Sequence, residues 1–420
     1  MARRLKRPAS DWLLLFLCAF EVSGFGLVAF YDGFSPFALL LCGLMPVLLV
    51  AQVLGLGRLF PHMDQQTLII GNFLCALGLI LLCRLRPDKA LRQFFFYLIG
   101  VGCMLAMTFF VARARNKRAL RWPVMLLAVG SLGLTLLVGE ETYGAKNWID
   151  LGVFSLQPSE FVKLALIYVF AIYLSERRAL RGNLPALVFA GVCLLLIVLQ
   201  KDLGAVLICF VLCLFMYYAA TGNLLLCSLA VVAACGGAVL MYLLFDHVQL
   251  RVAMWQNPWV SPTEGGYQII QALVAIGSGG MAGLGLGLGS PTTIPVYDTD
   301  FIFAALCEEM GILVGLMVLL VYVLLFLRAG LLALRSRSAL DSLLCVGVLA
   351  SLSSQTFLIV GGVVKMIPLT GVTLPFISYG GSSLLSSMLM LGVLQGVSIN
   401  AGRREESAWL RAHGREEAET

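Results

Sequence analysis

Residues 297–328 read YDTDFIFAALCEEMGILVGLMVLLVYVLLFLR, in which two carboxylates, Asp298 and Asp300, precede a long apolar segment. An α-helix needs about 20 predominantly apolar residues to cross the hydrocarbon core of a bilayer. The segment therefore predicts a membrane-spanning helix with the two carboxylates at its mouth. Before it comes the longest loop of the chain, residues 246–300, which carries GGYQ at 265–268 and GSGGMAGLGLGLGS at 277–290.

The loop at 246–300 is too long to be a simple connection. Loops of this length in compact proteins are usually functional or disordered. This one contains aromatic residues, glycines and short apolar runs, a composition that favours an ordered, functional loop. Its glycine run lacks the GK[ST] ending of a nucleotide-binding P-loop, so we interpret its glycines as allowing tight turns and close helix approach.

The composition of the whole chain is that of a membrane protein. Of its 420 residues, 60% are hydrophobic and only 12% are charged, and the mean hydropathy is +0.94. These values lie outside the range of soluble globular proteins. The twelve cysteines show no CxxC spacing and there are only three histidines, which argues against a disulfide framework or a His-rich metal centre. The net charge of +6 gives no indication of nucleic acid as a partner.

Apolar runs of spanning length recur along the chain and predict an all-α polytopic integral membrane protein with about twelve transmembrane helices. The weakest pair surrounds Gln200-Lys201-Asp202, which interrupts one long apolar stretch. The predicted spans cover residues 12–31, 36–56, 67–85, 92–113, 122–139, 158–175, 184–200, 203–219, 223–245, 301–328, 340–362 and 380–400.

Lysine and arginine orient this array, because cytoplasmic loops are enriched in both. Counting the spans places five basic clusters on one face, the cytoplasmic one, together with both termini. These clusters occupy residues 3–7, 113–121, 176–181, 328–337 and 403–404. The exception is the cluster of Arg84, Arg86, Lys89 and Arg92, which the count places outside. One cluster against five leaves the predicted orientation unchanged.

The outer face then collects the residues that could carry chemistry. Glu160 and Lys163 are three residues apart at the start of a span, so they share a helix face. Ionisable residues inside a membrane cost ~2.5–3.5 kcal/mol on insertion scales, which makes them functional candidates. The alternative for this pair is a structural ion pair that only joins two helices.

Further candidates on the outer face are mostly cations. Lys146 and Arg251 could bind phosphate, with Trp148 close to Lys146, although tryptophan is also enriched at membrane interfaces. Asp202, after Lys201, lies in a short turn between two spans, where a charge is often simply solvated.

Asp300 is the strongest candidate for a general base. A carboxylate where a loop meets a helix at the membrane boundary is partly desolvated, which raises its pKa and improves its basicity. The alternative is that Asp300, or Thr299 beside it, only caps the helix. Asp298 is expected to be the more solvated of the two carboxylates.

Together these features suit a lipid-linked, phosphate-bearing substrate that enters from the outer leaflet. The proline- and glycine-rich segment at 367–383, IPLTGVTLPFISYGGSS, has irregular backbone of the kind tolerated at membrane depth where it lines a cavity. An aspartate could take a proton from a sugar hydroxyl, cations could stabilise a departing diphosphate, and a groove between helices could hold an isoprenoid tail.

Several stretches, in order, also resemble the motifs of the SEDS (shape, elongation, division, sporulation) family, which includes RodA, FtsW and SpoVE. The resemblance covers about residues 67–400. The matching stretches are GAKNWIDLG (144–152), QPSEFVKLALI (157–167), KDLGAVLI (201–208), GGYQIIQALVAIGSGGMAGLGLG (265–287), TDFIFAALCEEMG (299–311) and IPLTGVTLPFISYGGSS (367–383).

The resemblance implies a peptidoglycan glycosyltransferase that polymerises lipid II on the outer face of the bacterial cytoplasmic membrane. The implied partners are lipid II and undecaprenyl-linked glycan, membrane lipid and a class B penicillin-binding protein (a transpeptidase). The family's catalytic aspartate falls on Asp300. Its substrate-binding positions fall on Lys146, Glu160, Lys163, Asp202, Arg251, Pro375 and Ser378. No cofactor is implied with certainty; a divalent cation such as Mg²⁺ is the one candidate.

The chain departs from the family pattern at Lys201, Asp298 and Ile359, where the family usually has Pro, His and Asn. Its first two spans also precede the family's ten-helix core. We therefore expect an extra N-terminal transmembrane pair at 1–64, a glycosyltransferase membrane core at 65–402, and a polar cytoplasmic tail at 403–420 that is solvated or frayed.

Two other functions stay open at this stage. A lipid II flippase or transporter would be expected to have discontinuous helices and paired sites at the bilayer midplane. A non-catalytic scaffold for a transpeptidase would have no need of Asp300. The polar residues gather at one mouth of the protein, which favours the enzyme.

Overall fold

The computed structural model confirms an all-α membrane protein. The structure describes residues 8–31, 35–114, 117–142, 145–150, 152, 154–176, 180–263 and 265–419. Within these residues, twelve helices are long and apolar enough to cross a membrane. They are α1 (Pro8–Tyr31), α2 (Pro36–Leu59), α3 (Gln65–Leu85), α4 (Pro87–Arg113), α5 (Arg121–Val138), α6 (Pro158–Ser175), α7 (Leu180–Leu199), α8 (Leu203–Thr221), α9 (Leu224–Leu244), α12 (Ile302–Arg335), α13 (Ala339–Val363) and α14 (Gly381–Glu419).

Shorter elements fill the connections. The short helices are η1 (Lys117–Leu120), α10 (Asp246–Gln256), η2 (Pro258–Val260), α11 (Tyr267–Gly279) and η3 (Pro291–Thr293). A small antiparallel sheet, in the order β1-β2-β3, is formed by β1 (Glu140–Thr142), β2 (Ala145–Asp150) and β3 (Ser155–Leu156). Because α10, α11, η2 and η3 all fall within residues 246–300, the prediction of an ordered loop there is confirmed.

The doubtful pair of spans at 184–219 consists of two separate helices. The backbone turns at Lys201, whose φ is +62°. Asp202 then acts as the N-cap of α8, and its side chain accepts a hydrogen bond from the N–H of Ala205 at 3.0 Å. A positive φ ends α7, and a capping carboxylate starts α8.

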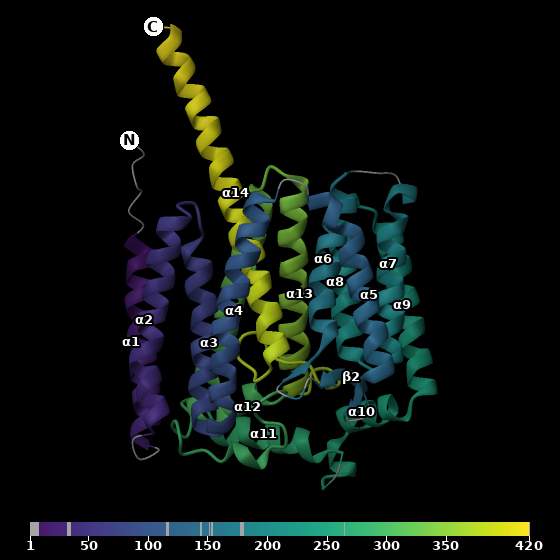
Figure 1. Ribbon diagram of the computed structural model, residues 1–420. Coiled ribbons are helices and arrows are strands. Elements are labelled where there is room, and N and C mark those ends of the chain that lie inside the picture. The colour runs from purple at the N-terminus through teal and green to yellow at the C-terminus, as the bar shows by residue number, and fades with distance from the viewer. Residues whose placement is uncertain are drawn as a thin grey trace.

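The helices form a bundle whose two ends differ (Figure 1). α1 begins and α14 ends at one end of the bundle, whereas α10, α11 and β2 lie at the opposite end. The N-terminal pair α1–α2 lies at one side, where α1 and α2 both pack against α3. α7 and α9 lie at the other side. This placement agrees with the alternation of spans expected from the sequence.

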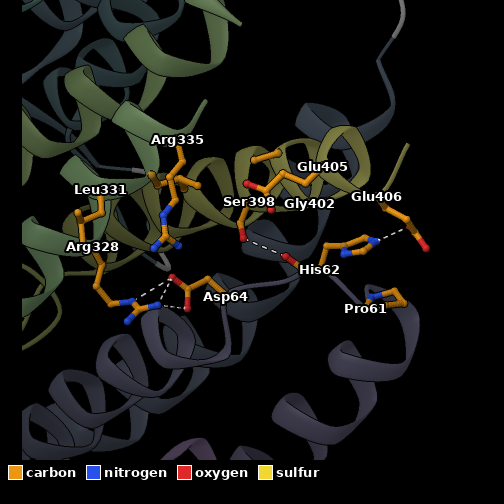
Figure 2. Close-up of a pocket in the computed structure, with 12 residues that line it drawn as sticks. Pro61, His62, Asp64, Arg328, Leu331, Arg335, Ser398, Gly402, Glu405 and Glu406 are labelled. Atoms are coloured by element: carbon orange, nitrogen blue, oxygen red, sulfur yellow. Dashed lines mark hydrogen bonds and ion pairs between the residues drawn. The ribbon is translucent and has the colours of Figure 1, made fainter. Parts of the chain in front are cut away.

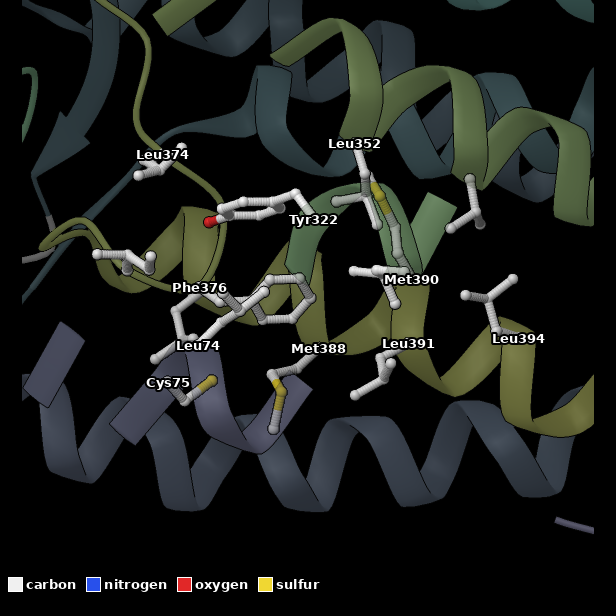
Figure 3. Close-up of a cluster of buried hydrophobic side chains, with 14 of the residues drawn as sticks. Leu74, Cys75, Tyr322, Leu352, Leu374, Phe376, Met388, Met390, Leu391 and Leu394 are labelled. Atoms are coloured by element: carbon white, nitrogen blue, oxygen red, sulfur yellow. The ribbon is translucent and has the colours of Figure 1, made fainter. Parts of the chain in front are cut away.

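The centre of the bundle is formed by α3, α6, α13 and α14, which are the most buried spans. Figure 3 shows one part of this core, where Tyr322 of α12 lies near Leu374 and Phe376. Leu74 of α3 and Met388 of α14 pack in the same cluster. The segment after α13 thus dips into the core before α14 begins.

α12 is interrupted at Gly311, where φ is +88° and ψ is 161°. This backbone region is essentially restricted to glycine. The glycine-rich loop fills the break and pairs with the backbone groups that the break releases, as backbone inside a membrane protein requires. The hydrogen bonds run from Leu284 N–H to Glu308 C=O (3.0 Å), Gly285 N–H to Glu309 C=O (2.9 Å), Ile312 N–H to Gly280 C=O (2.9 Å) and Leu313 N–H to Met281 C=O (3.2 Å). The glycines therefore allow close approach, as predicted.

The tail at 403–420 was expected to be solvated or frayed. Residues 403–406 are exposed, but the tail is not frayed, because α14 continues as a helix to Glu419. Its extension leaves the bundle as a single helix (Figure 1). Two contacts attach its first turns to the bundle. Nη2 of Arg404 lies 3.3 Å from Oδ2 of Asp341, and Nε2 of His62 lies 3.0 Å from Oε2 of Glu406.

Candidate active site

A cavity of about 730 Å³ lies at the end of the bundle that carries α10, α11 and β2. Its walls come from α4, β2, α6, α8, α10, α11 and the loops around residues 296–300 and 369–381. Seven of the ten predicted site residues line it. They are Trp148, Glu160, Lys163, Lys201, Asp202, Arg251 and Asp300.

Asp300 lies in the wall of this cavity, in the turn before α12. The helix begins at Ile302, and its N-cap position is Phe301, without a side-chain cap. The capping interpretation of Asp300 and Thr299 is therefore wrong. Burial raises the pKa of Asp300 to about 6, although a hydrogen bond from Thr299 and the charge of Arg251 oppose the rise. Such a carboxylate is ionised at neutral pH and basic enough to accept a proton.

Arg251, on α10, faces Asp300 across Gly371. A Cβ atom added at Gly371 would lie 3.6 Å from Oδ2 of Asp300 and 4.0 Å from Nη2 of Arg251. The guanidinium is oriented by Nη1, which donates to the carbonyl of Thr370 at 3.2 Å. Glycine at 371 thus keeps open the space between a base and a cation, where negative charge that develops in a reaction can be stabilised.

Glu160 and Lys163 form the ion pair that their spacing predicts. Nζ of Lys163 lies 2.8 Å from Oε2 of Glu160 and donates to Oε1 of Gln355, on α13, at 2.6 Å. The same Glu160 oxygen accepts from the hydroxyl of Ser386, on α14, at 2.6 Å. The pair joins three helices, which confirms the structural interpretation, and it also lines the cavity, where its functional role stays a prediction.

Asp202 is buried, which contradicts the interpretation of a solvated charge in a turn. One oxygen caps α8, and the other accepts from Nδ2 of Asn147 at 2.9 Å and from Nε2 of Gln157 at 3.0 Å. The carboxylate thus accepts from three donors, on β2, before α6 and in α8. Asp202 therefore fixes β2 and the start of α6 against α8 on one side of the cavity.

Asp298 is also buried, so the expectation that it is the more solvated carboxylate is wrong. Its side chain forms an ion pair with Lys89 of α4, and its carbonyl accepts from the N–H of Tyr379 at 2.9 Å. The Lys89 ammonium also lies 4.9 Å from the centre of the Tyr379 ring. The next residue, Thr299, accepts through its carbonyl from the hydroxyl of Ser378 at 2.6 Å. These contacts hold the backbone on which Asp300 stands.

Three predicted site residues, Lys146, Pro375 and Ser378, are placed elsewhere than in the cavity lining. Lys146 lies on β2, and its N–H donates to the carbonyl of Gln200 at 2.9 Å. The carbonyl of Pro375 accepts from the hydroxyl of Tyr322 in the core. Among the described residues, these three support the walls of the site and do not face its interior.

Polar residues outside the predicted set also line the cavity, among them Lys89, Arg92, Asn147 and Gln157. The sequence does contain a signal for Lys89 and Arg92, because the basic cluster at 84–92 departs from the positive-inside pattern. A cation on the outer face needs a partner or a substrate there, and Lys89 has Asp298. Asn147 and Gln157 lie inside the matching family motifs. They carry no charge, so the presence of ionisable groups in a membrane protein gives no signal for them.

A second cavity, of about 340 Å³, lies at the opposite end of the bundle (Figure 2). Two pairs of its charged residues contact each other. In the first, Arg328 donates to both oxygens of Asp64, with Nη2 2.8 Å from Oδ1 and Nε 3.0 Å from Oδ2. The ring of His62 contacts Glu406, and the backbone carbonyl of His62 accepts a hydrogen bond from the hydroxyl of Ser398 at 2.9 Å. This cluster ties the connection between α2 and α3 to α12 and α14, and none of the predicted site residues belongs to it.

Among the described residues, no group of three or more His, Cys, Asp or Glu side chains is arranged to hold a metal ion. Asp202 and Asp298 are occupied by hydrogen bonds and an ion pair with the protein. A Mg²⁺ requirement stays a prediction.

The fold and site define an integral membrane protein with a cavity lined by charged residues at one end of its bundle. The family model of FtsW, RodA and SpoVE, described as cell cycle protein, matches residues 77–403, and the chain belongs to this family. The peptidoglycan glycosyltransferase RodA of Mycobacterium tuberculosis (strain ATCC 25618 / H37Rv) is 34% identical over 380 residues, which cover 83% of this chain and 81% of that protein.

Two solved structures are also similar. A chain from a peptidoglycan synthase complex, described as coordinating polymerization and crosslinking, has 27% identity and a TM-score of 0.67, covering 81% of this chain and 98% of that chain. The rod shape determining protein RodA of Thermus thermophilus has 27% identity and a TM-score of 0.56, covering 80% of this chain and 96% of that chain. Sequence and structure thus agree on the family and on a multi-pass membrane fold.

Proposed function

We propose that this protein is a peptidoglycan glycosyltransferase that polymerises lipid II into β-1,4 glycan strands on the outer face of the bacterial cytoplasmic membrane. Family membership and the names of the relatives support the enzyme class. The observation that carries the mechanism is the position of Asp300, a carboxylate with a pKa of about 6 in a cavity that also contains Arg251.

In the proposed reaction, the 4-hydroxyl oxygen of the glucosaminyl group of one lipid II attacks C1 of the muramyl group of a growing lipid-linked strand. Asp300 accepts the hydroxyl proton as the O4–C1 bond forms. The bond between C1 and the diphosphate oxygen breaks, and its electron pair leaves with undecaprenyl diphosphate. A positioned base contributes ~10²–10⁴ in rate to such a step.

The cations and apolar residues of the cavity fit a diphosphate linked to a lipid. Arg251 and Lys201 lie on the wall formed by α8 and α10, where they stabilise the charge of the departing diphosphate. Leu203, Leu250 and Met254 line the same region and offer apolar contact to the first isoprene units.

The two alternative functions have less support from this geometry. A lipid II flippase is expected to have its sites at the bilayer midplane, whereas the charged cavity lies at one end of the bundle. The break of α12 at Gly311 is filled by the glycine-rich loop and does not open into the cavity. A non-catalytic scaffold does not need a positioned base. The residues that flank Asp300 make many contacts that hold it in place, which favours the enzyme.

The proposed orientation places both termini in the cytoplasm and the cavity outside. The positions of the basic clusters support it, as does the placement of the start of α1 and the end of α14 at the bundle end opposite the cavity. We further propose a class B penicillin-binding transpeptidase as partner, since a similar chain belongs to a complex that coordinates polymerization and crosslinking.

The test is polymerisation of lipid II by the purified protein, with and without a co-expressed class B transpeptidase. We expect glycan strands from the wild type and at least ~10²-fold less from Asp300→Asn, with lipid II binding retained. Glycan formation by Asp300→Asn at close to the normal rate would place the base elsewhere and overturn the mechanism. Absence of glycan from the wild type with its partner would overturn the function.

A further inference from the structure

The last residue of α1 contacts the glycine-rich loop that leads to Asp300. A Cβ atom added at Gly287 would lie 2.9 Å from Cδ1 and 3.1 Å from Cε1 of Tyr31. The ring of Tyr31 therefore lies against the α-carbon of Gly287, and a glycine with a φ of +92° allows this approach. α1 precedes residues 77–403, which the family model matches. The contact thus joins a helix outside the matched region to a loop inside it.

Gly287 is also held by the end of α3. Nη2 of Arg84 donates to the carbonyl of Gly287 at 2.9 Å, and Nε of Arg84 lies 3.8 Å from Oε1 of the buried Glu309, on α12. The neighbouring Glu308 accepts through Oε1 from the N–H of Ser290, further along the loop, at 2.9 Å. The loop is therefore attached to α3 and α12 by polar contacts, and to α1 by the packing of one ring.

The N-terminal pair is fixed to the rest of the bundle by a buried polar triad. Nε2 of Gln52, on α2, donates to the hydroxyl of Tyr97, on α4, at 2.8 Å. That hydroxyl donates to Oδ1 of Asn72, on α3, at 2.6 Å, and Nδ2 of Asn72 donates to Oε1 of Gln52 at 3.3 Å. Each of the three side chains both donates and accepts, and a buried network of this kind is rigid. The triad therefore fixes α2 against α3 and α4.

α1 packs tightly in the turns that precede Tyr31. A Cβ atom at Gly24 would lie 2.5 Å from Cδ1 of Ile80, so the backbone of α1 lies directly on α3 there. Phe25 and Val28 are buried. These contacts lie within about two helical turns of Tyr31 and fix the position of its ring, although the residue is 51% exposed. α1 ends at the bundle end where α10 and α11 lie (Figure 1).

The segment from Gly287 to Asp300 is held at both of its ends. At its start are the contacts of Gly287 with α1 and α3. Towards its end, the hydroxyl of Tyr297 donates to the carbonyl of Leu85, the last residue of α3, at 3.3 Å. The short helix η3 lies between these two points. Loss of the contact with α1 would therefore loosen the segment at its start and displace the carboxylate at its end.

We propose that Tyr31 is a positioning residue, through which the N-terminal pair holds the glycine-rich loop and, with it, Asp300. The effect on catalysis rests on the proposed function, whereas the effect on the loop does not. Ring carbons make the contact, so the ring is needed and the hydroxyl is not. A displaced base slows the chemical step, so Tyr31 acts on kcat. Arg251 has its own contact with the carbonyl of Thr370, so substrate binding is largely kept.

Hydrogen exchange of the full chain in detergent, followed by mass spectrometry, tests the contact itself. In Tyr31→Ala, peptides that cover residues 281–290 should exchange about fivefold faster or more, because a loop that loses packing opens more often. Tyr31→Phe keeps the ring and should exchange like the wild type. The matched control is Phe16→Ala, which removes another exposed ring from α1 and should leave these peptides unchanged. Unchanged exchange in Tyr31→Ala would overturn the proposal.

Initial rates of lipid II polymerisation test the effect on the site. We expect Tyr31→Ala to lower kcat by about fivefold or more, within the ~10² that a displacement of about 1 Å can cost, with KM within about twofold. Tyr31→Phe should restore the wild-type kcat, and Phe16→Ala should not alter it. A KM that rises while kcat stays unchanged, or a Tyr31→Phe variant as slow as Tyr31→Ala, would overturn the proposed role.

A double-mutant cycle tests the path from the N-terminal pair to the loop. Gln52→Met breaks the polar triad and should speed exchange at 281–290 in an otherwise wild-type chain. In the Tyr31→Ala background it should add less than about twofold, because Gln52 acts through Tyr31. Additive effects would overturn this path. A wild type that polymerises no lipid II would instead overturn the proposed function and leave the exchange results to decide the contact, so the two failures are distinguishable.

Discussion

The carboxyl group of Asp300 has a pKa of about 6 because its surroundings disfavour the charged form. A general base works only when ionised, so kcat/KM should fall about tenfold for each pH unit below 6 and level off above it. Initial rates measured between about pH 5 and pH 8 check this. A profile that is flat across pH 6 would show that another group accepts the proton.

The raised pKa also predicts that Asp300 reduces stability at neutral pH. The pKa is higher in the folded protein than in the unfolded chain, so the folded state binds the proton more tightly. Stability is therefore lost as the pH rises from the ordinary value of 3.8 through about 6, and the loss is complete above that. Asp300→Asn should therefore raise the thermal midpoint at pH 7.5, by an amount equivalent to at most about 3 kcal/mol, with little change at about pH 4. An equal shift at both pH values would point to packing and not to charge.

Asp298 should act through the position of Asp300. Its replacement by Asn leaves the partly buried Lys89 without its carboxylate, which we expect to cost about 1–3 kcal/mol and to lower activity. The double variant Asp298→Asn/Lys89→Met removes the unpaired charge and should recover most of the lost stability. Thermal unfolding in detergent and initial rates measure both effects. Wild-type stability in Asp298→Asn would show that the ion pair contributes nothing.

At the scale of the element, the break in α12 depends on one residue. A Cβ atom at Gly311 would lie 2.4 Å from the carbonyl oxygen of Met281 and 2.5 Å from the nitrogen of Gly283. Gly311→Ala combines this clash with a φ of +88°, and we expect it to destabilise the protein by about 3 kcal/mol or more. The glycine-rich loop that leads to Asp300 would then no longer pack against α12.

The control lies in the same helix. A Cβ atom at Gly330 would meet only Cδ2 of Leu349 at 3.8 Å, and its backbone is helical. Gly330→Ala should be neutral or stabilise α12 by about 0.5–1 kcal/mol. The thermal midpoints of Gly311→Ala and Gly330→Ala, measured in the same detergent, test this difference. Similar behaviour of the two would mean that the glycine-rich loop adapts to a side chain at 311.

At the scale of the whole molecule, the orientation in the membrane can be tested with single cysteines. Gln256 is exposed at the end of α10, and Arg337 is exposed in the connection between α12 and α13, at the opposite end of the bundle. In a background without the native cysteines, a membrane-impermeant maleimide should label Gln256→Cys on intact cells and Arg337→Cys only after permeabilisation. The reverse pattern would place the cavity in the cytoplasm.

The fold was predictable from the sequence because its main determinant is the apolar run, a local property of the chain. Each predicted span has a helix, even at the interruption by Gln200, Lys201 and Asp202. The helical extension of α14 was not predicted, because its polar residues are typical of a solvated tail. Its contacts, such as Arg404 with Asp341, join residues that are distant in the sequence, and no local pattern reports them.

Most of the charged residues that line the cavity were predictable from the sequence, but their pairing was not. Asp300, Arg251 and the Glu160–Lys163 pair stood out as charges on the outer face of a membrane protein. The sequence could not show that Asp298 meets Lys89, because the two are separated by 209 residues and only the packed fold brings them together. For the same reason, the sequence could not show that the hydroxyl of Ser378 donates to the carbonyl of Thr299.

The basic cluster at 84–92 has a consequence for the biogenesis of the protein. In the proposed orientation, the hairpin of α3 and α4 must carry a net of three positive charges outward, since Asp88 balances only one of four cations. The membrane potential opposes this by ~2.3 kcal/mol per charge for each 100 mV. The groups that later receive Arg84 and Lys89, the carbonyl of Gly287 and the carboxylate of Asp298, lie 203 and 209 residues further along the chain. We therefore expect this hairpin to be less stably inserted until the second half of the chain, with these partners, has been synthesised.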